Sequence, residues 1–382
     1  MKGWQRMSDG ADRALTRTPP QPSPLPVGAR EKRRHRLVPF VVATLLAFGA
    51  KAEPETVTYA TPGSLSMSSA PYAFASALGF FQNENLKLDV VVLHGSSEII
   101  PQILKGDVLT STLTPDLLIA SRQPGRPNFP LHYAYNVYRH SIWQMAVLDS
   151  SPIKSFEDLG GKTIGVGGLT FANVMQTKAL LRQNRVDPAS VNFVAVGNVG
   201  PALDTLKRGQ IDALNLFAYT NATLETQGIK IRRLEYPPEF ADTSSHGLLF
   251  SDHMIAQHPD RIERFGRALA EGTVACNANP DGCLDAFWAK FPDQKPRELD
   301  DTVRAQQRLI LKAVIDPMVA GPKKFGEYDD ADWKVSIDSL KAGGELKDTD
   351  IPLTSLYTNQ FVDAFNKFDR DAVIALAKAW HP

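Results

Sequence analysis

Residues 153–183 read IKSFEDLGGKTIGVGGLTFANVMQTKALLRQ and contain one strand, one glycine-rich turn and one helix. Lys162–Val166 has the apolar, β-branched character of a buried strand. Gly167–Thr170 is expected to turn, and Ala172–Gln183 has the apolar spacing of a helix. Just upstream, Ser155–Asp158 resembles a capping box and predicts a helix start. A strand that turns directly into a helix is typical of α/β proteins.

The same alternation of strand and helix extends in both directions from this stretch. Downstream we expect strand, helix and strand at Val191–Val196, Pro201–Arg208 and Ile211–Phe217. Upstream we expect strands at Val57–Ala60, Leu86–Leu93, Val108–Leu113 and Ile142–Leu148, and helices at Pro71–Asn83 and Glu98–Lys105. After a strand at Gly247–Ser251, helices dominate, at Asp260–Ala275, Leu284–Lys290, Glu298–Val314, Asp330–Lys341 and Asn359–Phe368. The pattern predicts an α/β fold in which each lobe is a mainly parallel sheet flanked by helices.

Two β-α-β-α-β units, followed by a return to helices, indicate two lobes between which the chain crosses twice. We place the crossing segments near residues 139–150 and 236–250. The predicted division is residues 1–52 as an N-terminal extension and leader, 53–143 with 246–382 as lobe 1, and 144–245 as lobe 2.

The N-terminal segment has the features of an export signal. Glu31–Arg36 (EKRRHR) is a basic region, and Leu37–Ala50 (LVPFVVATLLAFGA) is an apolar run too short for a membrane span, which needs roughly 20 residues. Ala50-Lys51-Ala52 is an A-x-A cleavage site, so we expect cleavage after Ala52. Whether export uses the general or the twin-arginine route stays open, as does the true start codon.

Charge is distributed unevenly along the chain. The 42 Lys/Arg balance the 42 Asp/Glu overall, but residues 1–52 hold ten basic and three acidic residues. The rest of the chain therefore has 32 basic and 39 acidic residues. An acidic body argues against nucleic acid as a partner, because phosphate binding needs a basic face.

The two cysteines, Cys276 and Cys283, enclose the turn-forming sequence NANPDG. Such a turn can bring the two sulfur atoms together, and a disulfide is compatible with an exported protein. No Cys or His lies near them in the sequence to complete a metal site, and their spacing is not that of a C-x-x-C redox motif. Whether they are bonded is left open by the sequence.

Five segments in order resemble the periplasmic nitrate/sulfonate/taurine-type solute-binding family, which includes binders of thiamine-pyrimidine precursors. They are Ala77–Leu88 (ALGFFQNENLKL), Leu104–Asp107, Ile153–Val166, Arg208–Ala213 and Leu356–Phe361. Ile153–Val166 is most similar to the family pattern, whereas Asn85 stands where the family usually has glycine.

This resemblance implies a type II-like periplasmic binding protein whose two lobes close over one ligand. It also implies a monomer that delivers the ligand to the membrane permease subunits of an ABC importer, with no enzymatic activity and no cofactor. Ligands of such α/β folds lie at the carboxyl ends of the strands, where helix N-termini face a cleft.

Carried onto this chain, the contact residues are those on the turns that follow the strands. In the first lobe these are Ser64, Ser66, Met67, Ser96, Ser97 and Thr114, and in the second they are Thr170, Phe171, Asn173, Tyr219 and Asn221. Several of them, including Ser96, Thr114 and Thr170, have the alternative role of capping a helix.

Three further candidates lie near the crossing segments. Trp143 is a stacking wall for a planar ligand or, alternatively, a side chain packed in the strand interior. Arg139 has the geometry to hold a carboxylate or sulfonate through two hydrogen bonds, but a solvated surface position is the alternative. His246 is a ligand contact or a loop or core histidine.

The ligand class is predicted as an anion, namely a sulfonate, nitrate or carboxylate with or without an aromatic ring, since helix N-termini favour negative charge. A thiamine-precursor pyrimidine or similar heterocycle is the alternative, supported by Thr358-Asn359 and the aromatic residues. A thiamine-pyrimidine synthase-like enzyme is a further alternative, but the C-C-C-F-C motif of those enzymes is absent from this sequence. The sequence also lacks H-E-x-x-H, G-x-S-x-G and P-loop motifs, and we expect no metal site.

Overall fold

The computed structural model describes residues 53–62, 65–93, 95–169, 172–197, 200–241, 244–342, 344–347 and 350–382. The predicted leader and its cleavage site lie outside these residues, and so do Ser64, Thr170 and Phe171. Ala52–Pro382 form one compact unit.

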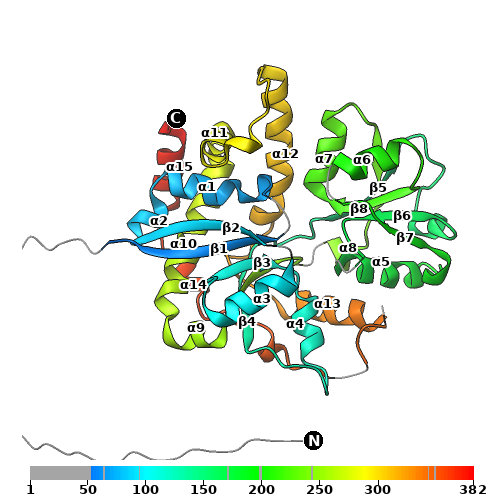
Figure 1. Ribbon diagram of the computed structural model, residues 1–382, viewed down its shortest axis with the longest axis horizontal. Helices are drawn as coiled ribbons and strands as arrows, with labels where there is room; N and C mark the ends of the chain where they lie inside the picture. The colour runs from blue at the N-terminus through cyan, green and yellow to red at the C-terminus, as the bar shows by residue number, and fades with distance from the viewer. Residues whose placement is uncertain are drawn as a thin grey trace, which may run out of the picture. The chain divides into compact units, whose positions relative to one another are not determined.

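Two five-stranded sheets organise this unit (Figure 1). The first sheet has the order β2-β1-β3-β10-β4, with β1 (Glu55–Pro62), β2 (Leu86–Leu93), β3 (Thr110–Leu113), β4 (Leu131–Asn136) and β10 (Gly247–Ser251). The second has the order β7-β6-β8-β5-β9, with β5 (Trp143–Leu148), β6 (Thr163–Val166), β7 (Asn192–Ala195), β8 (Ala213–Phe217) and β9 (Ile231–Arg233). The chain passes between them through residues 137–142 and 234–246, which we call the first and second crossing segments.

Both sheets are mixed and contain parallel and antiparallel strand pairs. In the first sheet β1 pairs in parallel with β2 and β3, while β10 is antiparallel to β3 and β4. In the second sheet β6 pairs in parallel with β7 and β8, while β5 is antiparallel to β8 and β9. Within each sheet four strands therefore run in one direction, as predicted for a mainly parallel sheet. The one reversed strand, β10 in the first sheet and β5 in the second, is the strand that follows a crossing segment. The α/β class is confirmed, whereas the predicted lobe boundaries stay a prediction.

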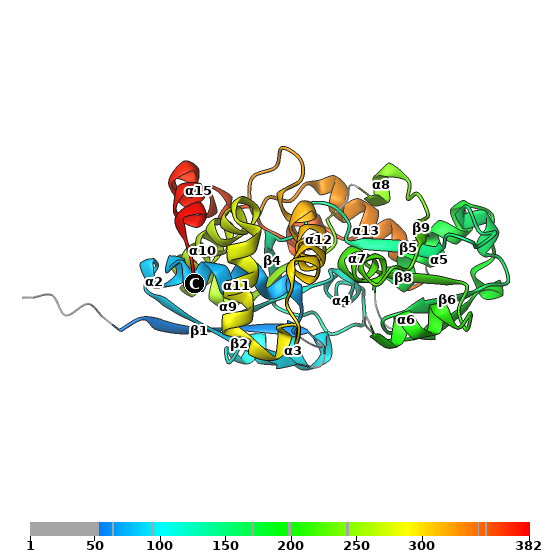
Figure 2. The ribbon, with the colours of Figure 1, turned by 90° about the horizontal axis from the view of Figure 1, so that it is seen from above.

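Helices cover both sheets (Figure 2). In the first part of the chain and around the second sheet they are α1 (Ala70–Ala77), α2 (Phe80–Asn83), α3 (Ser96–Lys105), α4 (Asp116–Ser121), α5 (Ala172–Gln183), α6 (Gly200–Lys207), α7 (Ala218–Thr226) and α8 (Pro238–Ala241). After β10 they are α9 (Asp252–Gln257), α10 (Pro259–Ala278), α11 (Pro280–Lys290), α12 (Asp301–Val319), α13 (Asp330–Ala342), α14 (Val362–Phe365) and α15 (Arg370–Ala379). Single 3-10 turns occupy η1 (Met67–Ser69), η2 (Phe156–Leu159), η3 (Pro188–Ser190), η4 (Pro292–Gln294) and η5 (Leu353–Ser355).

Glycine explains two differences from the predicted helices. The expected helix Pro71–Asn83 is divided into α1 and α2 because Gly79 has a φ of 80°, a left-handed conformation that ends a helix. The capping box at Ser155 forms as predicted, but it begins only the turn η2. Gly161, with a φ of 71°, then leads the chain directly into β6.

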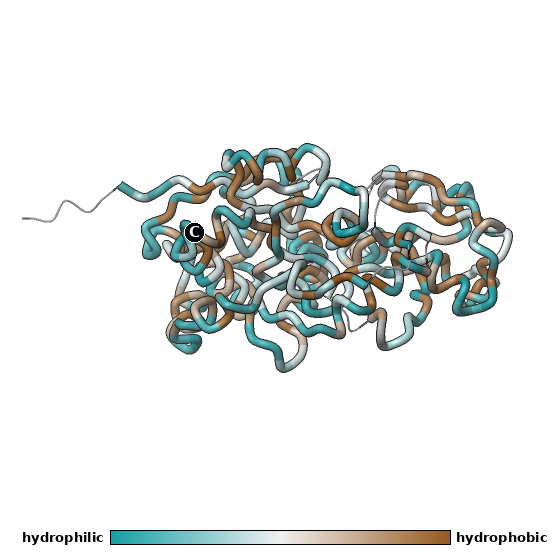
Figure 3. Tube along the Cα trace, turned by 90° about the horizontal axis from the view of Figure 1, so that it is seen from below, coloured by the Kyte–Doolittle hydropathy of each residue, from teal (hydrophilic) through white to brown (hydrophobic). Residues whose placement is uncertain are grey.

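The C-terminal helices differ from prediction in their extent. The expected helix Asn359–Phe368 is the single turn α14, and α15 follows it without having been predicted. The strands β4 and β9 were also missed. None of the helices in the described part of the chain is both long and apolar enough to cross a bilayer. Hydrophobic and hydrophilic residues alternate along the Cα trace (Figure 3).

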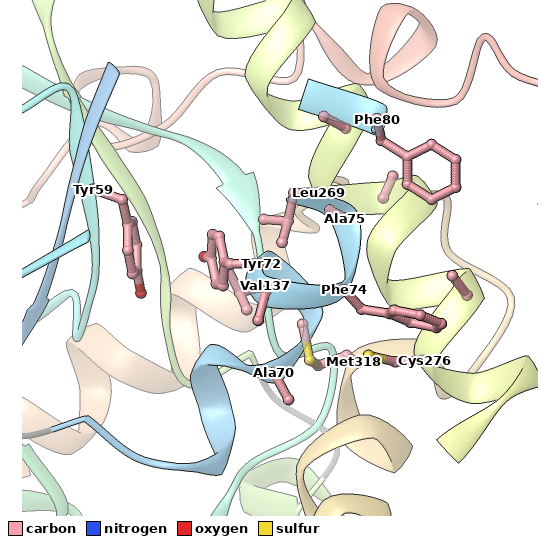
Figure 4. Packing of buried hydrophobic residues seen from close by; sticks show 14 of the residues in the cluster. Tyr59, Ala70, Tyr72, Phe74, Ala75, Phe80, Val137, Leu269, Cys276 and Met318 are labelled. Carbon is pink, nitrogen blue, oxygen red and sulfur yellow. The ribbon is translucent and has the colours of Figure 1, made fainter. Parts of the chain in front are cut away.

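The largest core lies where α1 packs on α10 (Figure 4). Tyr72 and Phe74 on α1 are buried together with Leu269 on α10. A Cβ atom on Gly272 would lie 2.5 Å from the carbonyl oxygen of Pro71, so only glycine permits this close approach of the two helices.

Cys276 and Cys283 form a disulfide that links α10 to α11, so the pairing left open by the sequence is present in the structure. The Asn279 side chain caps α11 by accepting a hydrogen bond from the Gly282 amide. Closing a loop of this length contributes roughly 2 kcal/mol in the chain-entropy description.

Glu271 on α10 gives the fold a predictable pH dependence. Burial, reinforced by the negative charge of Glu84 and opposed by Arg267, raises the pKa of Glu271 from 4.5 to about 7. A carboxyl whose pKa rises on folding contributes stability below its unfolded pKa and loses it as the pH rises through the folded pKa. Stability should therefore fall between pH 4.5 and about 7 through this group.

Because the carboxyl is half-buried and screened by solvent, we expect Glu271→Gln to increase the free energy of unfolding at pH 8 by about 1 kcal/mol. At pH 4 the substitution should have little effect. Urea unfolding at the two pH values measures the difference, and equal effects at both would show that the pKa of Glu271 is not raised.

Candidate ligand-binding site

Side chains from the two sheets meet beside the crossing segments. Ser66, which follows β1, forms a hydrogen bond with the hydroxyl group of Tyr219, which follows β8. The Ser66 hydroxyl also lies 2.8 Å from that of Ser68. Two predicted contact residues, one from each sheet, are therefore in direct contact. Met67, the next residue, is buried in the first core.

Tyr219 belongs to a group of five neighbouring aromatic side chains, which we call the aromatic cluster: Tyr138, Trp143, Phe217, Tyr219 and His246. Phe217 lies between Trp143 and Tyr219, with ring centroids 4.5 and 5.2 Å away and interplanar angles of 26° and 12°. His246 lies 5.6 Å from Trp143 and 6.0 Å from Tyr138. Phe217, Tyr219 and His246 are partly exposed, so the cluster presents ring surface to a ligand.

The electrostatic character of the aromatic cluster is neutral. Burial lowers the pKa of His246 to about 3, so its imidazole is uncharged at physiological pH. Burial raises the pKa of Tyr219 to about 12, and the hydrogen bond from Ser66 opposes this only in part. The cluster therefore offers flat, uncharged surface.

Two hollows adjoin the aromatic cluster along the second crossing segment. The first is lined by Pro115, Tyr133, Ser244, Ser245, His246, Gly247, Tyr328, Asp332, Trp333 and Ser336. The second is lined by Pro115, Asp116, Trp143, Met175, Gln176, Ser244, Ser245, Ser336, Ser339 and Leu340. The second hollow thus lies between the turn after β3 in the first sheet and α5 beside the second. Each hollow has room for about one water-sized group.

A hydrogen-bond network fixes the second crossing segment at these hollows. The carboxylate of Asp332, on α13, accepts hydrogen bonds from the Ser244 amide (3.2 Å) and the Ser244 hydroxyl (3.0 Å). It also pairs with Lys323 at 2.7 Å. Asn136, at the end of β4, donates to the Ser244 hydroxyl from 2.6 Å. The segment is therefore tied to the first sheet and to α13 together.

C-terminal helices contact the second sheet's helices on both sides of the crossing segments. Helix α12 packs against α7, where the Gln306 side chain donates to the Thr226 carbonyl from 2.8 Å. Helix α13 packs against α5, where Arg182 donates to the Ala342 carbonyl (Figure 1). Both helices therefore connect the C-terminal part of the chain to helices that cover the second sheet.

Other predicted residues lie at the strand ends and make internal contacts, although the side-chain oxygens of Asn173 and Asn221 have no hydrogen-bond partner among the described residues. Thr114 donates to Asp116, whose pKa is raised by burial. Asn173 is fully buried and donates to the Asn215 carbonyl, and Asn221 is fully buried and donates to Gln144. These contacts hold the turns in place.

Ser96 and Ser97 lie at the first two positions of α3, but neither caps it. The N-cap is Gly95, whose φ of 85° suits glycine. The capping role expected for these serines was therefore wrong, whereas their position at a helix N-terminus is as predicted.

Arg139 lies apart from the hollows. Its guanidinium group is buried, lies 4.6 Å from the centre of the Phe325 ring, and donates to the Ala320 carbonyl from 3.4 Å. The alternative of a solvated surface arginine was wrong, because the side chain is only 6% exposed. Its observed contacts connect the first crossing segment to the end of α12.

Sequence reasoning missed Phe217, Ser244, Ser245, Trp333 and Ser339. Phe217 ends a predicted strand, and its position two residues before Tyr219 was the available signal. The two serines lie inside the predicted second crossing segment, where small polar residues pass as loop composition. Trp333 and Ser339 lie on α13, far away in sequence from every strand end.

Comparison with known proteins agrees with this architecture. The profile of the family described as NMT1/THI5 like matches residues 66–283. The riboflavin-binding protein RibY of Chloroflexus aurantiacus is 22% identical over 299 residues, which cover 77% of this chain and 82% of RibY.

Solved structures share the fold at low identity. The alkanesulfonate-binding protein SsuA of Xanthomonas axonopodis pv. citri, bound to MOPS, has a TM-score of 0.59 and 13% identity over 80% of this chain and 100% of SsuA. The desulfurization enzyme DSZB has a TM-score of 0.50 and is 15% identical, and the match covers 81% of this chain and 98% of the DSZB chain. The fold alone therefore does not separate binding from catalysis. The profile of the NMT1/THI5 like family covers more than half of this chain, which has the fold of the periplasmic solute-binding proteins. The chain therefore belongs to the NMT1/THI5 like family.

Proposed function

We propose that this protein is the exported solute-binding component of an ABC importer and that it captures a planar aromatic heterocycle between its two sheets. The observation that carries the proposal is the aromatic cluster. Trp143, Phe217 and Tyr219 form a nearly parallel series of rings at the junction of the sheets, with His246 beside them. Such a surface favours a flat ligand through stacking and burial of apolar area.

Charge supports a heterocycle over the predicted small anion. Among the described residues that line the two hollows, none is lysine or arginine, while Asp116 and Asp332 are both present. Arg139, the expected partner for a carboxylate or sulfonate, lies against Phe325, donates to the Ala320 carbonyl and lines neither hollow. The anion remains the second candidate, favoured by Ser96 and Ser97 at the N-terminus of α3.

The importer role rests on membership of a solute-binding family and on the relatives named above. RibY is named as a riboflavin-binding protein and SsuA as an alkanesulfonate-binding protein, and we extend the class of function, not the ligand, to this chain. The proposal includes export, a monomeric state, transfer of the ligand to permease subunits, and no turnover of it.

Thermal unfolding of the mature chain tests this function. The ligands are riboflavin and 4-amino-5-hydroxymethyl-2-methylpyrimidine, with taurine, a longer alkanesulfonate and nitrate as the anion set. A ligand at about 100 times its Kd should stabilise the fold by about 2.7 kcal/mol. We expect stabilisation by a heterocycle and recovery of the compound unchanged. Stabilisation by the anions alone would contradict the ligand class, and conversion of a compound would contradict the binding role.

A further inference from the structure

Three buried polar groups in the two hollows lack a hydrogen-bond partner among the described residues. They are the hydroxyls of Ser245 and Ser339 and the indole N–H of Trp333. These side chains are 4%, 3% and 3% exposed, so bulk water does not satisfy them. Leaving such a group unpaired costs roughly 1–3 kcal/mol, which makes a ligand group the natural partner.

These groups converge on the second crossing segment. Ser245 lines both hollows, Trp333 lines the first and Ser339 lines the second. His246, whose Nδ1 also lacks a partner among the described residues, lines the first hollow too. We call Ser245, His246, Trp333 and Ser339 the polar subsite.

The polar subsite is continuous with the aromatic cluster. His246 belongs to both, and Trp143 of the cluster lines the second hollow. A flat ligand stacked on the cluster would therefore direct one polar edge or substituent into the hollows.

The chemistry of the polar subsite is uncharged and mixed. Trp333 supplies only a donor, and each serine supplies a donor and acceptors. Two carboxylates stand at its edge: Asp332 in the first hollow, and Asp116 in the second. A carbonyl, amide or hydroxyl group can satisfy these donors and acceptors. A phosphate would meet the Asp116 carboxylate, and the cation beside Asp332, Lys323, is already paired with that carboxylate and lines neither hollow.

Size leads to the same conclusion. Each hollow accepts about one water-sized group, so a hydroxyl or a carbonyl oxygen fits. A tetrahedral phosphate with its hydration shell does not.

We propose that the polar subsite binds an uncharged carbonyl- or hydroxyl-bearing end of the heterocycle and that it rejects the phosphate ester of the same compound. This inference rests on the proposed function and adds the class of substituent that the site selects. The protein would thereby accept a nutrient in its dephosphorylated form only.

Two matched pairs of compounds test this selectivity: riboflavin with riboflavin 5′-phosphate, and the hydroxymethylpyrimidine with its phosphate. Kd is measured by calorimetry on the mature chain. We expect at least one free compound to bind and its phosphate to bind at least about 100-fold more weakly. Equal affinities within a pair that binds would overturn the proposal, and so would binding of neither pair.

Substitutions separate the polar subsite from the rest of the site. Trp333→Phe keeps an aromatic ring but removes the N–H, and Ser245→Ala removes one hydroxyl. Each should weaken binding of the free compound about 10-fold without lowering the Tm of the ligand-free protein, because the group makes no hydrogen bond with the described residues.

Ser336→Ala is the matched control. The Ser336 hydroxyl lines both hollows but already donates to the Asp332 carbonyl from 3.2 Å, so affinity should change less than twofold. If Tyr219→Ala weakens binding while Trp333→Phe and Ser245→Ala do not, the polar subsite is wrong and the proposed function stands. If neither pair of heterocyclic compounds binds and the alkanesulfonates do, the polar subsite and the proposed function are both wrong.

Discussion

Tyr219→Ala should lower the affinity for a planar heterocycle about 100-fold, the largest effect on binding that we expect from one substitution. The phenol ring lies 5.2 Å from Phe217 at an interplanar angle of 12° and is partly exposed. Removing it eliminates one stacking surface, and ring stacking is worth roughly 1–3 kcal/mol for each aromatic partner. A 100-fold change in Kd corresponds to about 2.7 kcal/mol.

Tyr219→Phe is the control for this prediction. It keeps the ring and removes only the hydroxyl that contacts Ser66. We expect its Kd to change less than twofold, since the stacking ring is kept and the lost hydrogen bond is internal to the protein, present with and without ligand. Calorimetric titration of both variants gives the comparison. Equal losses would assign the effect to the Ser66 contact, and full affinity in Tyr219→Ala would remove the aromatic cluster from the site.

Asp332→Ala should reduce the free energy of unfolding by about 3 kcal/mol, the largest effect on stability that we expect. Asp332 is 6% exposed, pairs with Lys323 and accepts two hydrogen bonds from Ser244. Removal of one member of a buried ion pair commonly costs 3–5 kcal/mol, because the partner remains buried and unpaired. In Asp332→Ala, Lys323 still pairs with Asp329 at 2.9 Å. We therefore expect a loss of stability at the lower end of that range.

Asp329→Asn provides a matched comparison. Asp329 pairs with the same lysine, but its side chain is 54% exposed, so its loss should cost less than about 1 kcal/mol. Urea unfolding of both variants measures the difference. A similar small loss in both would mean that Asp332 does not fix the second crossing segment.

The repeated order of strand and helix is what the sequence specifies well. Lys162–Val166 and Ala172–Gln183 are strongly patterned, and the strand and helix appear there with bounds shifted by at most one residue. The two sheets have equivalent strand orders because each is built from the same three-strand unit plus two further strands, the inner one of which enters after a crossing segment. Periodicity does not reveal strand direction, so the antiparallel pairing of β5 and β10 was not predicted.

Part of the candidate site coincides with residues predicted from the sequence, and their role in binding stays a prediction. Tyr219, Trp143 and His246 lie where strands end or crossing segments begin, and general rules for α/β sheets locate such positions from sequence. Their mutual contact was not predictable, because it depends on how the first sheet sits beside the second. The same limit applies to Trp333 and Ser339, which α13 brings to the second crossing segment from about 90 residues away in the chain.

Buried polar side chains were the least predictable part of the site. Asn173 and Asn221 follow strands as a ligand contact would, yet each donates a hydrogen bond to its own half of the molecule. Arg139 has the chemistry to bind an anion, but the ring of Phe325, contributed by the C-terminal part of the chain, lies against it. Residue type and loop position did not predict these internal contacts, and a role of the three residues in ligand binding stays a prediction.

A crystal structure of the mature chain with the heterocycle that stabilises it most tests the central claim directly. The account predicts the ligand ring within about 4 Å of Tyr219, between the two sheets, with an uncharged substituent that accepts a hydrogen bond from the Trp333 N–H. A ligand bound elsewhere on the surface, or an anion held at the N-terminus of α3 with the aromatic cluster uncovered, would contradict it.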